Sequence, residues 1–406
     1  MTTTAPARHA APAGVGEDAD LALLTGPEAV EIVRVALVGA GAPPADLRVS
    51  VASVHHRPGA GVGVCYDVSH AGAPAGEVIV ASTATPRVHD RADGVAILDD
   101  GARVLRVWRR ADDPALPGLR AALDSATVAA WLGQEAALEV VSYRPTRRAV
   151  VAARAEQQTF YLKVVRPRRA GDLVERHRAL QGSALPAPDV LDEPEPGVVL
   201  LAPARGRSLA QALAAADPAL VPPPESVLAA LDSMPARVTD LAGRPSWVDR
   251  LDFHTAAARS ALPTRAAEVD GVAHRVVAIL GRMRLAPAVP THGDLNVANL
   301  FVDAGRPAGV IDVDSLGPGS RADDLATLMA HLLVLPPLAP QIYVGVPAVI
   351  DHWRAVFGAS VGARELDART AAVLISLVAG ASPDQANARL DLATAAVERA
   401  EGGIAS

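Results

Sequence analysis

The stretch Thr291–Ser315 reads THGDLNVANLFVDAGRPAGVIDVDS, and its pattern decides how the second half of the chain folds. Leu300–Val302 and Gly309–Ile311 are short apolar runs on either side of a segment rich in turn-forming residues. Two such runs separated by a turn predict a β-hairpin. Because the open ends of a hairpin lie side by side, we expect Asn299, at the entry of the first strand, to lie near Asp312, at the exit of the second.

A third polar residue, Asp294, lies on the loop before this hairpin, five positions before Asn299. Carboxylate and amide oxygens suit a hard cation such as Mg²⁺. Phosphoryl transfer uses this set of groups, with one carboxylate orienting the attacking hydroxyl and an Asn and an Asp holding magnesium on the phosphate oxygens. A surface loop that uses Asp and Asn only for turns is the alternative, and it explains Asp303. Three polar residue types at two fixed spacings favour the site for Asp294, Asn299 and Asp312.

The letters HGDLNVAN followed by IDVD resemble the Brenner-type motif of aminoglycoside phosphotransferases and the related choline kinase-like proteins. These are small-molecule kinases with a protein-kinase-like fold, and they carry HGD and IDxD where protein kinases carry HRD and DFG. The resemblance implies that Asp294 is the catalytic base and that Asn299 and Asp312 are magnesium ligands. Asp314 is then the second acidic residue at the same strand end.

Lys163 is the only lysine of the chain, since arginine supplies every other basic side chain of this type. Lysine is a compact point charge and arginine a planar fork, so a single retained lysine indicates a site where arginine does not serve. It lies on Phe160–Val165, a predicted strand, and resemblance to the kinase N-lobe implies that it meets the α- and β-phosphates of ATP. A helix predicted over Asp172–Leu180 carries Glu175, the best candidate to pair with Lys163; a solvated helix charge is the alternative for Glu175.

A buried strand ending in a proline, Val198–Pro203, looks like the hinge strand between two kinase lobes. The backbone of Leu201 and Ala202 is the expected contact for adenine, because Pro203 has no N–H. The first hairpin of this lobe carries Arg144–Arg148 instead of G-x-G-x-x-G, so the loop that covers the phosphates stays unassigned.

The hydrophobic content, net charge and cysteine count of the chain limit the classes of protein to which it can belong. The chain is 50% hydrophobic and 20% charged, as expected for a globular protein with a large core. A net charge of −7 argues against nucleic acid as a partner, and a single cysteine excludes a disulfide framework. Without a signal peptide or an uninterrupted apolar span, we expect no membrane partner and a cytoplasmic location. The oligomeric state stays open.

The predicted fold is α+β, two-lobed and protein-kinase-like, with an additional N-terminal α+β domain. We expect a disordered tail over residues 1–18, an accessory domain over 19–124, a kinase-like N-lobe over 125–203 and a mostly helical C-lobe over 204–406. Helix-then-hairpin patterns recur before and after residue 124, which suggests a degenerate duplication of the N-lobe; two unrelated hairpins that share an Arg-Pro turn are the alternative. In that alignment Val80-Ala81 stands where Leu162-Lys163 stands in the second copy.

The expected function is ATP- and Mg²⁺-dependent phosphoryl transfer to a hydroxyl of a small molecule such as an aminoglycoside, an aminosugar or a sugar. The alternatives are a nucleotide-binding pseudokinase, a protein kinase, and a maltokinase- or homoserine-kinase-like enzyme acting on a neutral or amino-acid acceptor. GTP in place of ATP also stays open. A predicted carboxylate cluster of Asp314, Asp323 and Asp324, in a region with a slight excess of acids, favours a cationic acceptor.

Overall fold

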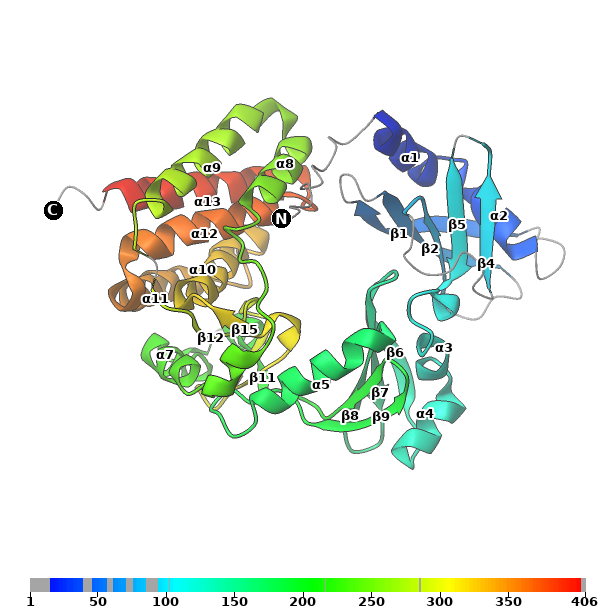
Figure 1. Ribbon diagram of the computed structural model, residues 1–406, viewed down its shortest axis with the longest axis horizontal. Helices are drawn as coiled ribbons and strands as arrows, with labels where there is room; N and C mark the ends of the chain where they lie inside the picture. Colours follow the sequence, from blue (N-terminus) through cyan, green and yellow to red (C-terminus); the bar gives the residue numbers. More distant parts are fainter. Residues whose placement is uncertain are drawn as a thin grey trace, which may run out of the picture. The chain divides into compact units, whose positions relative to one another are not determined.

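The computed structural model describes residues 15–38, 46–56, 61–70, 76–84, 94–101, 103–215, 217–284 and 286–402. The fold is α+β, as the sequence predicts, and Figure 1 shows its elements coloured along the chain. The chain divides into two compact units, one made of Met1–Gly171 with Leu191–Ala202 and the other of Asp172–Val190 with Pro203–Ser406.

The first unit begins with a helix-covered antiparallel sheet. Helices α1 (Val15–Thr25) and α2 (Ala29–Val38) pack on one face of it, where Leu24 and Val33 meet the side chains of the central strands. The strands, in the order β1-β2-β3-β5-β4, are β1 (Arg48–His56), β2 (Val62–Ser69), β3 (Glu77–Ser82), β4 (Val95–Asp99) and β5 (Val104–Arg109).

One expectation for this region needs correction, and two of its strands were not predicted. Residues 15–18, expected as the end of a disordered tail, form the first turn of α1, while residues 1–14 of that tail lie outside the described residues. The strands β4 and β5 were not foreseen, because the polar Arg106 interrupts the apolar pattern of β5. Arg106 is nevertheless buried in the sheet.

A second antiparallel sheet completes the first unit. Helices α3 (Leu119–Ala122) and α4 (Ser125–Leu132) cover one face of it, and the side chain of Asp124, rather than that of Ser125, caps α4 by accepting from the Thr127 N–H. The strands, in the order β6-β7-β8-β10-β9, are β6 (Ala137–Arg144), β7 (Arg148–Arg154), β8 (Thr159–Val165), β9 (Val190–Glu195) and β10 (Val198–Leu201).

The two sheets have the same strand order, and each has a register irregularity in its first strand. In the second sheet Val150, Lys163 and Val199 face one another across three strands. Cys65, Val80 and Trp108 do so in the first sheet. When the two sheets are aligned on these irregularities, Val80 stands at the position of Lys163, one residue away from the expected Ala81. The first sheet has no lysine there.

The second unit is mainly helical. Its core joins α8 (Leu251–Ala261), α9 (Ala266–Leu280), α10 (Arg321–Leu338), α12 (Ala363–Val378) and α13 (Pro383–Gly402). The remaining helices are α5 (Ala170–Ala179), α6 (Leu209–Ala214), α7 (Pro224–Asp232) and α11 (Val346–Val361). Its strands are β11 (Arg207–Ser208), β12 (Val289–Thr291), β13 (Leu300–Asp303), β14 (Arg306–Val310) and β15 (Gly317–Gly319).

Helix α5 belongs almost entirely to the second unit, although residues 125–203 were expected to form one lobe. The buried Arg176 of α5 donates to the carbonyl of Ala242, and Arg237 donates to the carbonyl of Ala179. These long-range hydrogen bonds attach the helix to residues that follow it by more than fifty positions. The chain returns to the second unit between Ala202 and Pro203, at the end of the predicted hinge strand.

The apolar segment after Asp324 forms α10, which continues through Pro336 and Pro337 and ends at Leu338. None of the helices described here has the length and apolar character needed to cross a membrane.

Candidate active site

The predicted hairpin is present and brings its two ends together. Strands β13 and β14 pair in antiparallel fashion from Leu300 opposite Val310 to the turn. One step beyond the ladder, the Ile311 N–H donates to the carbonyl oxygen of Asn299 at 2.9 Å. Asp312 follows immediately in a left-handed conformation, with φ of 57°. Asn299 and Asp312 therefore flank the open end of the hairpin, as the sequence predicts.

Side-chain amides hold the loop before the hairpin. The Nδ2 atom of Asn299 donates to the carbonyl oxygen of Asp294 at 2.9 Å, which ties the two ends of the loop together. Asn296 caps the turn between them, because its Oδ1 atom accepts from the N–H groups of Ala298 and Asn299. Asn299 is buried, whereas the side chain of Asp294 is half-buried and reaches solvent.

His292 links the loop to the far strand of the hairpin, a role that was not predicted from the sequence. Its Nδ1 atom accepts from the Asp294 N–H at 3.3 Å, so its Nε2 atom must be the donor to the Ile311 carbonyl oxygen at 2.9 Å. The imidazole is fully buried. His292 thus fixes the backbone of Asp294 relative to the residue that precedes Asp312, and its place beside Asp294 in the motif was the available signal.

Asp324, at the start of α10, holds the same loop through its backbone N–H groups. Its two carboxylate oxygens accept from the N–H groups of His292 and Gly293, each at 2.8 Å. The carboxylate is completely buried, and burial raises its pKa, while the nearby His292, Arg321 and the two N–H groups oppose that shift. Asp324 therefore has a structural role in the loop.

Gly293 is required by close packing against the segment that follows Asp312. Its φ is +77°, a conformation that favours glycine, and a Cβ atom here would lie 2.5 Å from the carbonyl oxygen of Ser315. The loop and the Asp312–Ser315 segment are therefore in backbone contact.

Two of the three carboxylates in the predicted acidic cluster are bound to other protein groups. Asp324 accepts hydrogen bonds from the loop backbone, and Asp323 accepts a hydrogen bond from Nη1 of Arg369 at 2.7 Å. Burial raises the pKa of Asp323, and the Arg369 charge opposes the shift. The third carboxylate of that set, Asp314, is half-buried.

Three of the other predicted site residues, Lys163, Leu201 and Ala202, lie in the first unit, and Glu175 lies in the second. Lys163 is on β8 and is 5% exposed, on the sheet face opposite α3 and α4, because Leu162 and Val164 point to those helices. Leu201 ends β10 and Ala202 is the last residue of the unit. Glu175 is exposed on α5 in the second unit, so its pairing with Lys163 stays a prediction.

Comparison with known proteins supports the predicted fold and family. Residues 95–369 match the model of the phosphotransferase enzyme family. The fold is similar to that of aminoglycoside phosphotransferase APH(4)-Ia, solved with AMP-PNP and hygromycin B, with a TM-score of 0.51 and 17% identity over 68% of this chain and 97% of that one. A search of curated proteins found no match.

Two further solved structures are more distant. Spectinomycin phosphotransferase APH(9)-Ia, in complex with ADP and spectinomycin, has a TM-score of 0.44 and 10% identity, covering 69% of this chain and 98% of that one. Macrolide 2'-phosphotransferase MphH from Brachybacterium faecium has a TM-score of 0.36 and 20% identity, covering 61% and 96%. The likeness to APH(4)-Ia confirms the two-lobed, protein-kinase-like fold, and β1–β3 precede the region that the family model matches, as an additional N-terminal domain does.

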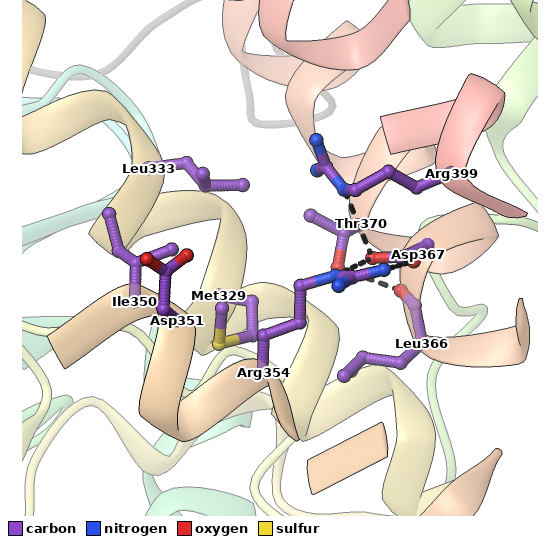
Figure 2. A pocket seen from close by; sticks show the side chains of 9 residues that line it. All are labelled: Met329, Leu333, Ile350, Asp351, Arg354, Leu366, Asp367, Thr370 and Arg399. Carbon is purple, nitrogen blue, oxygen red and sulfur yellow. Dashed lines mark hydrogen bonds and ion pairs between the residues drawn. The ribbon is translucent and has the colours of Figure 1, made fainter. Parts of the chain in front are cut away.

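The buried Asp324 is expected to act on turnover and not only on stability. Asp324→Asn removes an acceptor for one loop N–H, so we expect the free energy of unfolding to fall by about 1–3 kcal/mol and kcat to fall at least tenfold. Asp367→Asn is the control, because Asp367 is also buried but binds Arg354 in a different part of the helical unit (Figure 2).

Thermal unfolding and initial rates of both variants separate the two effects. Asp367→Asn should lose stability and keep its kcat. Equal loss of kcat in both variants would show that Asp324 does no more than stabilise the fold.

Proposed function

Because the chain belongs to the phosphotransferase enzyme family and is a small-molecule kinase, we propose that it transfers the γ-phosphate of ATP to a hydroxyl group of a small molecule, with Mg²⁺ bound. The observation that carries this proposal is the hydrogen-bonded loop that joins Asp294 to Asn299 and, through His292, to the strand end before Asp312. Catalysis of phosphoryl transfer is mainly positioning and electrostatic stabilisation, and this loop supplies fixed positions.

Asp294 is the proposed catalytic residue. Its half-buried carboxylate accepts a hydrogen bond from the acceptor hydroxyl, aligns its oxygen and takes its proton late, because the transition state is loose. The buried side chains of Asn299 and His292 hold the Asp294 backbone, so the carboxylate needs little reorganisation before reaction.

Asn299 and Asp312 are the residues that would hold magnesium. The Nδ2 atom of Asn299 donates to the Asp294 carbonyl, so its Oδ1 atom is the one left for a cation. Asp312 adds charged oxygens at the other side of the hairpin opening. This pair fits Mg²⁺, which prefers hard oxygen ligands and, when bound, neutralises charge on the β- and γ-phosphate oxygens.

The first unit supplies the proposed nucleotide contacts. Lys163 holds the α- and β-phosphates, and Glu175, from the second unit, is the proposed partner that orients its ammonium group. The backbone of Leu201 and Ala202 binds the adenine, so discrimination between ATP and GTP depends on backbone groups. The AMP-PNP in the solved APH(4)-Ia complex supports a nucleoside triphosphate as donor. A complete set of Lys163, Asp294, Asn299 and Asp312 favours an active enzyme over a pseudokinase.

The acceptor is better matched to a neutral or anionic polyol than to an aminoglycoside. A cavity of about 110 Å³ lies against Gly293 and Ser315, next to the catalytic loop, and Arg244, Trp247 and Arg250 line it. The guanidinium of Arg250 stacks over the Trp247 ring at 4.7 Å, and both arginines are exposed. Asp323, the carboxylate that lines this cavity, is already paired with Arg369.

Asp294→Asn should lower kcat by about 10²–10⁴-fold, the usual contribution of a positioned general base, with little change in folding. Asp303→Asn is the matched control on the same hairpin, because the Asp303 carboxylate pairs with the exposed Arg205. Initial rates at saturating ATP and acceptor measure both. Near-native turnover of the Asp294 variant would exclude it as the catalytic base.

Magnesium titrations test the proposed ligands. Asp312→Ala should raise the Mg²⁺ concentration for half-maximal rate more than Asn299→Ala does, since it removes a full charge. If both variants titrate with Mg²⁺ as the native protein does, the cation is bound elsewhere.

Three sugars that differ in one group test the acceptor: glucose, glucosamine and glucuronate. We expect the lowest KM for glucuronate or glucose, and a glucuronate KM that rises with ionic strength because salt screens the arginines. Arg250→Gln should raise that KM severalfold, whereas Arg259→Gln, on the helix that follows, should not. Glucosamine as the best acceptor, with a KM insensitive to Arg250→Gln, would contradict this assignment.

A further inference from the structure

The turn between β6 and β7, Arg144–Arg148, is held by a residue from outside its own sheet. Asp113 follows the last strand of the first sheet, and its Oδ2 atom accepts from the Thr146 N–H at 2.7 Å and from the Tyr143 hydroxyl at 2.8 Å. Its Oδ1 atom accepts from the Ala115 N–H at 2.9 Å. Asp113 is 3% exposed, so all three hydrogen bonds are shielded from water.

Tyr143 extends this contact to the first sheet itself. Its hydroxyl accepts from Nε1 of Trp108, and its ring packs against a small cluster formed by Cys65, Val78, Val80 and Trp108. This cluster lies on the sheet face that corresponds to the Lys163 face of the second sheet, because Val80 takes the lysine position. In the first sheet, that face therefore supports the neighbouring hairpin and is not open to a nucleotide.

The turn needs such support because of its backbone conformation. Thr146 has a φ of 60°, a left-handed conformation that is unfavourable for a residue with a Cβ atom. Its N–H donates to Asp113, and its carbonyl oxygen accepts from Nε of Arg166 at 2.7 Å. Both backbone polar groups of Thr146 are thus bonded to charged side chains. Arg166 follows β8, only three residues after Lys163.

The charges of the turn also lie close to the first sheet. Arg144 and Arg147 are exposed, and with burial as the larger cause, their charges lower the pKa of His55 on β1. The turn therefore brings several cationic side chains to a position that the N-terminal domain fixes.

We propose that Asp113 and Tyr143 are positioning residues through which the N-terminal domain holds the β6–β7 turn in the conformation that covers the nucleotide phosphates. In protein kinases the equivalent turn is a flexible glycine-rich loop that closes over the phosphates. This chain has no glycine in the turn, and a second domain fixes it instead. The inference builds on the proposed function, since it assumes that a nucleotide binds beside this turn.

The test compares Asp113→Asn and Tyr143→Phe with Asp112→Asn in the full-length protein. Asp112 is the matched control, because its carboxylate pairs with the exposed Arg120 and not with the turn. Each hydrogen bond lost from a buried carboxylate is strong enough to change affinity about tenfold. We expect Asp113→Asn to raise the KM for ATP about tenfold, with a smaller rise for Tyr143→Phe and little change in kcat at saturating ATP.

Hydrogen exchange at the Thr146 amide gives a readout that does not depend on activity. Exchange should accelerate in Asp113→Asn, and Mg-ATP should slow it in the native protein. Faster exchange with an unchanged KM for ATP would overturn the proposal, because the clamp would then be purely structural. If Mg-ATP protects no amide of the native protein, the proposed nucleotide site fails first and the inference fails with it.

Discussion

Two hydrogen bonds from the backbone N–H groups of His292 and Gly293 to the buried carboxylate of Asp324 hold the loop that carries Asp294 against the start of α10. A buried carboxylate is costly unless its oxygens are hydrogen-bonded, and the two N–H donors, with Arg321 nearby, offset that cost. The same bonds fix the loop in one place. The positions of Asp294 and Asn299 depend on that anchor, because the side-chain bonds of His292 and Asn299 extend it to the reactive residues.

Buried side chains support this site, and one of them, Asn299, is also a proposed magnesium ligand. His292, Asn299 and Asp324 are buried and hydrogen-bonded, whereas Asp294 and Asp312 are half-buried and reach solvent. The first sheet also contacts the elements beside it. It repeats the strand order of the second sheet, but Val80 replaces the lysine, and its Trp108 contacts Tyr143. The first sheet thus has the strand order of the second without its lysine, and it contacts the hairpin of β6 and β7.

Local sequence patterns correctly predicted the elements that form between residues close together in the chain. The apolar runs around residues 303–307 predicted the hairpin, and its geometry brought Asn299 near Asp312. Long-range pairing was not visible in the sequence. The bond between Asp323 and Arg369 spans 46 positions and removes a carboxylate from the expected acidic cluster. The attachment of α5 to the second unit depends on Arg176 and Arg237, whose partners are equally distant in the chain.

We propose that the protein transfers phosphate to a hydroxyl group and not to water. Phosphorus NMR of a reaction with Mg-ATP and a panel of neutral, anionic and cationic polyols tests this proposal most directly. We expect ADP and a phosphate monoester in equal amounts with at least one neutral or anionic polyol. Production of ADP with inorganic phosphate alone, whichever polyol is added, would contradict it.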